Sequence, residues 1–145
     1  MANTLSAILA LDAVKTTRRV DLGDCDEAYR GAVFDVWVTP TRAHWSAFSE
    51  YVQWLNTEPQ RRQQERDQLP EAERAEFDRT MGEQLDREMY ERLDAWLAET
   101  WTNLSQGEVT QIREHLQEAY PAAWDWLYNA TLRTMREYRE NLTKN

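Results

Sequence analysis

The chain has 145 residues, of which 41% are hydrophobic, and its net charge is −9. This length fits a single domain over residues 1–145, and the apolar fraction supplies a core, which argues against global disorder. The charge argues against direct binding to nucleic acid, because phosphate recognition needs a basic stripe, but it permits a basic partner or imitation of DNA.

The N-terminal third predicts a short helix and a β-hairpin. Apolar residues at near-helical spacing between Leu5 and Val14 indicate the helix. Residues 16–22 alternate in part and end at a glycine, which is typical of a strand. Residues 32–38 are rich in β-branched and aromatic side chains and predict a second strand. Because only a turn or short loop over residues 24–31 separates them, we expect antiparallel pairing against a supporting surface.

A long helix is predicted after the hairpin. Thr39 is a suitable N-cap, and the proline that follows it suits the first helical position. Apolar residues then recur at steps of three and four, which predicts one buried face. Its members are Trp45, Phe48, Val52 and Leu55. Trp54 points away from that face.

The middle of the chain is strongly charged. Residues 57–80 are either a charged linker or an exposed helix between a 1–56 part and an 81–145 helical part. Pro70 predicts the start of another helix, and Gly82 is a candidate bend. Two pairs have the favourable i,i+4 orientation of glutamate before arginine. These pairs are Glu83–Arg87 and Glu88–Arg92.

Two helices are predicted in the C-terminal part. Ser105 and Glu108 form a capping-box pattern for the first, whose apolar residues are Val109, Ile112, Leu116 and Ala119. A proline restarts the second, whose buried seam is Trp124, Leu127, Tyr128, Thr131, Met135, Tyr138 and Leu142. Trp126 lies on the opposite face. The fold class is therefore α+β and mainly α, with an N-terminal β-hairpin followed by four or five helices.

The sequence offers no pattern typical of catalysis, a metal or a cofactor. His44 and His115 are far apart and are best interpreted as helix-surface or boundary residues. Cys25 lies among acidic residues, which disfavour a thiolate. The acidic group around it lacks the order of calcium ligands in an EF-hand and predicts a solvated turn. Its members are Asp21, Asp24, Asp26 and Glu27. We expect no enzyme, no metal and no cofactor.

A single cysteine and the absence of a membrane-length apolar run also bear on location. One cysteine forms no intramolecular disulfide, which favours a reducing compartment. The N-terminus lacks the basic region of a signal peptide, and no apolar run approaches about 20 residues. We therefore expect a cytoplasmic protein that does not bind membranes.

The tryptophans are the remaining candidates for a binding role. Trp37, Trp45 and Trp96 fall on predicted apolar faces, as does Trp124 in the C-terminal seam, so they are interpreted as core. Trp54 and Trp126 lie off their apolar stripes. They are either partner-binding anchors, because tryptophan is enriched at interfaces, or packing residues under a second layer.

The segments AILALDAVKTTRRVDLGD and VFDVWVTPTRAHWSAFSEYV resemble the opening of tail assembly chaperones of long-tailed bacteriophages. In that family a Lys-Thr pair leads into a strand, and a second strand runs into a helix with a Thr- or Ser-containing start. Lys15 and Thr16 provide the pair here, and the similarity covers roughly the first 55 residues. The family's frequent Pro-Glu-Trp-Gly-Gly-like turn is replaced by residues 23–27.

The resemblance implies a protein made during virion morphogenesis in the host cytoplasm. It would bind and solubilise the tape measure protein, help recruit the tail tube protein, and self-associate as many such chaperones do. The runner-up is an acidic phage-encoded inhibitor or DNA mimic that acts on a host nucleic-acid-binding protein through residues 58–99, which hold 13 acidic and 7 basic residues. An enzyme of unknown type has the least support.

Overall fold

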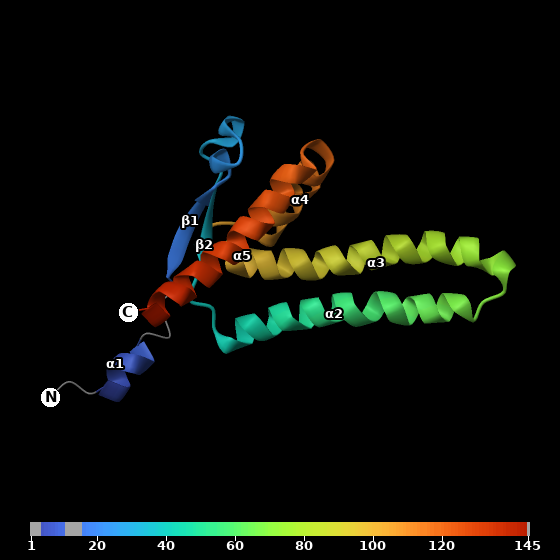
Figure 1. Ribbon diagram of the computed structural model, residues 1–145, viewed down its shortest axis with the longest axis horizontal. Coiled ribbons are helices and arrows are strands. Elements are labelled where there is room, and N and C mark those ends of the chain that lie inside the picture. The colour runs from blue at the N-terminus through green and yellow to red at the C-terminus, as the bar shows by residue number, and fades with distance from the viewer. Residues whose placement is uncertain (1–3, 11–15, 145) are drawn as a thin grey trace. The chain divides into compact units, whose positions relative to one another are not determined.

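The computed structural model describes residues 4–10 and 16–144. This part of the chain is mainly helical and carries a two-stranded antiparallel sheet (Figure 1), which confirms the predicted class. In chain order the elements are α1 (Thr4–Ala10), β1 (Thr17–Asp21), the 3-10 helices η2 (Leu22–Asp24) and η3 (Glu27–Tyr29), β2 (Val33–Trp37), α2 (Arg42–Asp67), α3 (Glu71–Thr100), α4 (Gln106–Ala119) and α5 (Pro121–Lys144). α1 confirms the predicted short helix, although Val14 lies outside the described residues.

The predicted hairpin is confirmed. β1 and β2 pair antiparallel, with Thr17 opposite Trp37 and Asp21 opposite Val33. Strand β2 buries Phe34 and Val36, which lie on one face of the strand, as expected for a β-branched and aromatic strand that packs on a core. The connection between the strands, predicted as a turn or short loop, contains η2 and η3.

The start of α2 differs from the prediction by two residues. Thr41, and not Thr39, is the N-cap, and its hydroxyl accepts a hydrogen bond from the N–H of His44 at 3.2 Å. The Thr39 hydroxyl instead serves the hairpin, because it accepts hydrogen bonds from the backbone N–H of Thr16 and from the indole N–H of Trp37, both at 3.1 Å. Both threonines suit an N-cap. The Thr39 hydroxyl is engaged by the Trp37 indole N–H, and Thr41 caps the helix.

The chain forms two compact units. The first unit comprises Met1–Pro40 and Ala98–Asn145, and the second unit comprises Thr41–Leu97. From the sequence we predicted boundaries between parts of the chain after residues 56 and 80. These boundaries lie inside α2 and α3, and each helix continues without a break across its predicted boundary. Residues 57–67 thus belong to a helix, and Gly82 lies within α3.

In the second unit, α2 presents a face to α3 that is shifted by one residue from the predicted one. The predicted face of α2 is only half-buried, whereas His44 and Tyr51 are buried. Trp96 on α3 packs against two residues of this face. The centre of its ring is 4.5 Å from that of Phe48 and 5.9 Å from that of His44. His44 is therefore a core residue, contrary to its interpretation as a surface or boundary histidine.

A buried arginine links the two helices of the second unit. Arg62 forms ion pairs with Glu58 at 3.0 Å and with Glu88 at 2.6 Å, so its charge is compensated on both helices. Because Glu88 pairs with Arg62, Arg92 makes a different contact from the predicted one and donates to the carbonyl oxygen of Glu88 at 3.0 Å. It also lies 5.0 Å from the ring centre of Trp54.

The core of the first unit lies between the hairpin and α5. The predicted seam of α5 is buried at Trp124, Leu127, Thr131 and Met135 and half-buried at its two tyrosines. Leu142 departs from the prediction, because its side chain is 60% exposed. Arg18 at the start of β1 lies over the Tyr138 ring at 5.0 Å, and Leu142 is one turn further along α5.

Trp101, which the sequence did not single out, is the centre of this core. It is fully buried, and its indole N–H donates to the Thr131 hydroxyl at 3.1 Å. Its ring lies 4.7 Å from that of Phe34 and 6.1 Å from that of Trp124. Its backbone forms a bridge with Val36, so the α3–α4 connection covers the outer edge of β2.

Candidate functional site: an apolar pocket between the hairpin and α4

The first unit contains a pocket of about 270 Å³ between the β1–β2 connection and α4. Its lining is dominated by apolar side chains: Leu22, Tyr29, Ala32, Phe34, Gln111, Ile112, His115 and Leu116. The buried side chains of Leu22, Phe34 and Leu116 form its floor. Half-buried Tyr29 and Ile112 stand at its margin. Such a surface binds apolar groups, because it offers little to hold a polar ligand.

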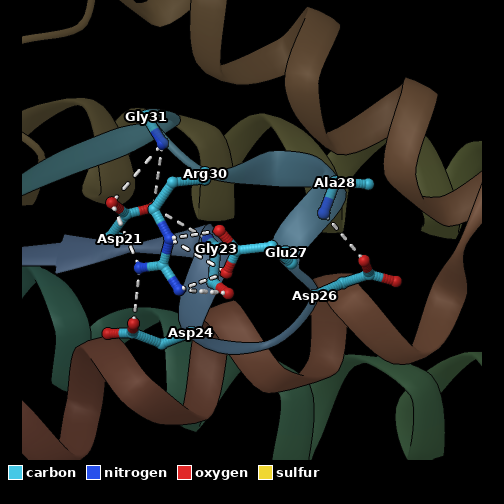
Figure 2. A network of polar contacts seen from close by, with 8 residues as sticks. All are labelled: Asp21, Gly23, Asp24, Asp26, Glu27, Ala28, Arg30 and Gly31. Carbon is cyan, nitrogen blue, oxygen red and sulfur yellow. Dashed lines mark hydrogen bonds and ion pairs between the residues drawn. The ribbon is translucent and has the colours of Figure 1, made fainter.

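An arginine-centred network fixes the connection that forms one wall of the pocket. Figure 2 shows the Arg30 side chain turned back over the connection. Its guanidinium donates to Asp24 at 2.7 Å, to Glu27 at 2.9 Å and to the carbonyl oxygen of Gly23 at 2.8 Å. It also pairs with Asp21 at 3.5 Å. Three of the four carboxylates that the sequence assigned to a solvated turn thus pair with one cation, whereas Asp26 accepts a hydrogen bond from the N–H of Ala28 at 3.0 Å.

The second half of the network is formed by Asp21. One carboxylate oxygen accepts hydrogen bonds from the N–H of Gly23 at 2.8 Å and of Gly31 at 3.3 Å (Figure 2). These backbone donors and the nearby Arg30 guanidinium lower the pKa of Asp21. The N–H of Leu22 donates to the carbonyl oxygen of Ala32 at 2.9 Å and closes the connection. Leu22 and Ala32 are therefore held where they line the pocket.

Two glycines permit this close packing. A Cβ at Gly23 would lie 2.6 Å from the Arg30 Cα and 2.7 Å from its Nε, which no side chain tolerates without displacement. Gly31 has φ +96°, a conformation that L-residues rarely adopt. The sequence identified Gly23 as a strand end, but the reason for a glycine there is its contact with Arg30.

The opposite wall of the pocket is formed by α4. The predicted capping box is present, since Ser105 and Glu108 each bond the other's backbone N–H. Tyr29 from the connection lies 6.2 Å from Tyr120 at the end of α4. The negative charge of Asp26 raises the pKa of Tyr120. The contact between Tyr29 and Tyr120 joins the connection to the end of α4.

The two tryptophans predicted as partner anchors do not line this pocket. Trp54 belongs to the second unit, where it is half-buried and covered by the guanidinium of Arg92. Trp126 belongs to the first unit and is half-buried on α5. Their partner-binding role stays a prediction.

The structure also locates the other side chains that the sequence considered for chemistry. Cys25 is a half-buried free thiol in the connection, and His115 is exposed at the margin of the pocket. Among residues 4–10 and 16–144, no group of three or more His, Cys, Asp or Glu residues is arranged to hold a metal ion. Ile112 and Leu116 were predicted as apolar positions of α4, but nothing local indicates that the connection faces them.

Comparison with protein families, curated proteins and solved structures gives no match. Within the described ranges, no helix is both long and apolar enough to cross a membrane. The geometry of the pocket is therefore the observation from which a function is inferred.

Proposed function

We propose that the protein is a phage tail assembly chaperone that binds and solubilises the tape measure protein during virion tail morphogenesis. The apolar pocket between the hairpin and α4 carries this proposal. The wall formed by the connection and β2 belongs to the part of the sequence that resembles such chaperones. The proposal assigns binding, and no catalysis or cofactor, to the chain.

The size and lining of the pocket favour a side chain of a protein partner over a small molecule. Pockets for drug-sized ligands measure about 300–1,000 Å³ and contain a few convergent polar groups. The present pocket, at about 270 Å³, is close to the lower end of that range, and its lining is mostly apolar. An amphipathic helix places apolar anchors three and four residues apart, and one or two of them would fill such a space by the helix-in-groove mode. A tape measure chain exposes apolar helix before the tail tube closes around it.

The acidic surface beside the pocket adds a preference for the partner's flanking residues. Glu114 and Glu118 on α4 are exposed. They are within three or four positions of Gln111 and His115 at the pocket margin, and therefore lie on neighbouring positions of the helix surface. A partner with lysine or arginine beside its apolar anchor would gain electrostatic complementarity. Because these charges are exposed, salt should screen that small contribution and leave the apolar contact as the main source of affinity.

The alternative function, an acidic inhibitor or DNA mimic, is favoured by the charge of the second unit. Residues 58–99 hold 13 acidic and 7 basic residues and lie almost wholly on α2 and α3. Several of the arginines already pair with acids there, including Arg61 with Glu65 at 2.5 Å and Arg66 with Asp78 at 2.7 Å. This internal pairing reduces the field that a basic partner would meet.

Co-expression with a tape measure fragment tests the proposal. We expect the wild-type protein to increase the soluble yield of the fragment. Ile112→Glu should abolish that increase, because a carboxylate in an apolar pocket loses its hydration. Leu142→Glu is the matched control, since this exposed leucine lies outside the pocket and its replacement should change little. Circular dichroism and thermal melting establish that both variants fold.

Two outcomes would decide against the chaperone. The first is a soluble yield with wild-type protein no greater than with an unrelated acidic protein. The second is a yield that depends on charge reversals in residues 71–99 and not on Ile112→Glu, with high salt reproducing the reversals. That pattern would favour the mimic.

A further inference from the structure

Helix α1 presents an apolar face that nothing in the described structure covers. Leu5, Ile8 and Leu9 are spaced i, i+3 and i+4 and are 65%, 57% and 58% exposed. The helix has seven residues and none of them is buried. Isolated helices shorter than about 12–15 residues are marginal in water, so α1 requires a surface to pack on. We propose that this surface is the apolar pocket of a second copy of the chain.

The chemistry of α1 matches this pocket. Its sequence TLSAILA contains no charged residue, so its apolar face enters without desolvating a charge. The floor of the pocket is formed by Leu22, Phe34 and Leu116. A second hollow of the first unit, near Leu142, is lined also by charged Arg18 and Glu137 and suits α1 less well.

The length of the chain favours a second copy over the same copy. Ala10 at the end of α1 is six residues from Thr16, so this segment spans at most about 22 Å. The pocket begins at Leu22, at the far end of β1, which is about 20 Å from Thr16 along an extended strand. Binding within one copy would demand a nearly fully extended connection, whereas α1 of another copy carries no such restraint.

Two-fold symmetry doubles the contact. If each copy gives its α1 to the pocket of the other, both apolar faces and both pockets are covered in a closed dimer. A single contact of this size would be weak. Two such contacts in one dimer strengthen each other, because the second forms between copies that the first already holds together. The inference rests on the proposed function only in taking the pocket as the place where an apolar helix binds. It adds regulation: α1 occupies the pocket until a client helix displaces it.

Sedimentation velocity of the full chain, without a client, tests this inference. Over about 1 µM to 1 mM, where weak self-association is measurable, we expect a reversible monomer–dimer equilibrium. Ile8→Glu in α1 and Ile112→Glu in the pocket should each raise the dimer dissociation constant at least about tenfold. Leu142→Glu should leave it unchanged. An equimolar mixture of the Ile8→Glu and Ile112→Glu proteins should associate more tightly than either alone, because one intact α1 then meets one intact pocket.

Three results would overturn the inference. They are a monomer at every concentration, a dimer that neither isoleucine variant weakens, and a dimer that Leu142→Glu weakens as much as they do. Since no client is present in this assay, each of these results leaves the chaperone proposal standing. Conversely, failure to solubilise a tape measure fragment would leave the sedimentation result intact.

Discussion

Replacement of Gly23 by alanine tests how the pocket wall is built. The added Cβ would lie 2.6 Å from the Cα of Arg30, so backbone and not only a flexible side chain must move. That movement would also disturb the Arg30 guanidinium, which donates to the carbonyl oxygen of Gly23 at 2.8 Å. The substitution therefore acts on the whole connection.

The magnitude follows from two opposing effects. Overpacking costs about 1–3 kcal/mol. Loss of glycine's freedom in the unfolded chain returns about 0.4–1 kcal/mol. We expect Gly23→Ala to lower the free energy of unfolding by about 1–2 kcal/mol. Gly107→Ala is the control in the same unit: it lies in the first turn of α4, its nearest heavy atom is the Ser105 hydroxyl at 4.0 Å, and alanine there should stabilise by up to about 1 kcal/mol.

Urea unfolding monitored by tryptophan fluorescence provides the assay, since buried Trp101 and Trp124 report on the first unit. Opposite signs for the two glycine variants are the predicted result. If Gly23→Ala stabilised the protein as Gly107→Ala does, the close packing of Arg30 on Gly23 would be refuted. The fixed wall of the pocket would then lose its explanation.

Three further predictions concern other parts of the molecule. Hydrogen bonds from Arg61 hold the pKa of Glu58 at about 2, below its ordinary 4.5, so the carboxylate stabilises the fold above pH 4.5 and this contribution is lost as the pH falls toward 2. Glu58→Gln should thus be less stable than wild type at pH 7, and thermal melts should converge as the pH falls through that window. Leu127→Ala should cost about 2–5 kcal/mol in urea unfolding, because the side chain is fully buried, and a loss below about 0.5 kcal/mol would show that the seam is not core. If Trp54 and Trp126 are partner anchors, alanine at either should reduce the soluble yield of a tape measure fragment with little loss of folding stability; unchanged yield would make them packing residues.

Local patterns predicted the elements well, because a single stretch of sequence contains their cause. Strand β2 was evident from its β-branched and aromatic residues, and α4 from its Ser105–Glu108 capping box, which the structure contains. The seam of α5 was predicted from Trp124 to Met135 for the same reason. Its extension to Leu142 was wrong, since periodicity does not reveal where the covering hairpin ends.

Features that depend on distant residues were missed. Trp101 follows the last residue of α3, and although it continues the four-residue spacing of Leu93 and Leu97, its burial depends on Phe34 and Thr131. Arg30 is one basic residue beside several acids, and only the folded connection places its guanidinium among them. The pocket was missed for the same reason, because its two walls, the hairpin connection and α4, are far apart in the sequence. A sequence gives no local sign of such a meeting.

The most direct test of the central claim is the affinity of the pocket for an apolar helix. A fluorescently labelled amphipathic peptide from the tape measure protein would be titrated with the wild-type, Ile112→Glu and Leu142→Glu proteins, and its anisotropy recorded. We predict saturable binding by the wild type, a dissociation constant at least about tenfold higher for Ile112→Glu, and no change for Leu142→Glu. Equal affinity of all three proteins, or no binding by the wild type, would contradict the claim that this pocket binds an apolar helix.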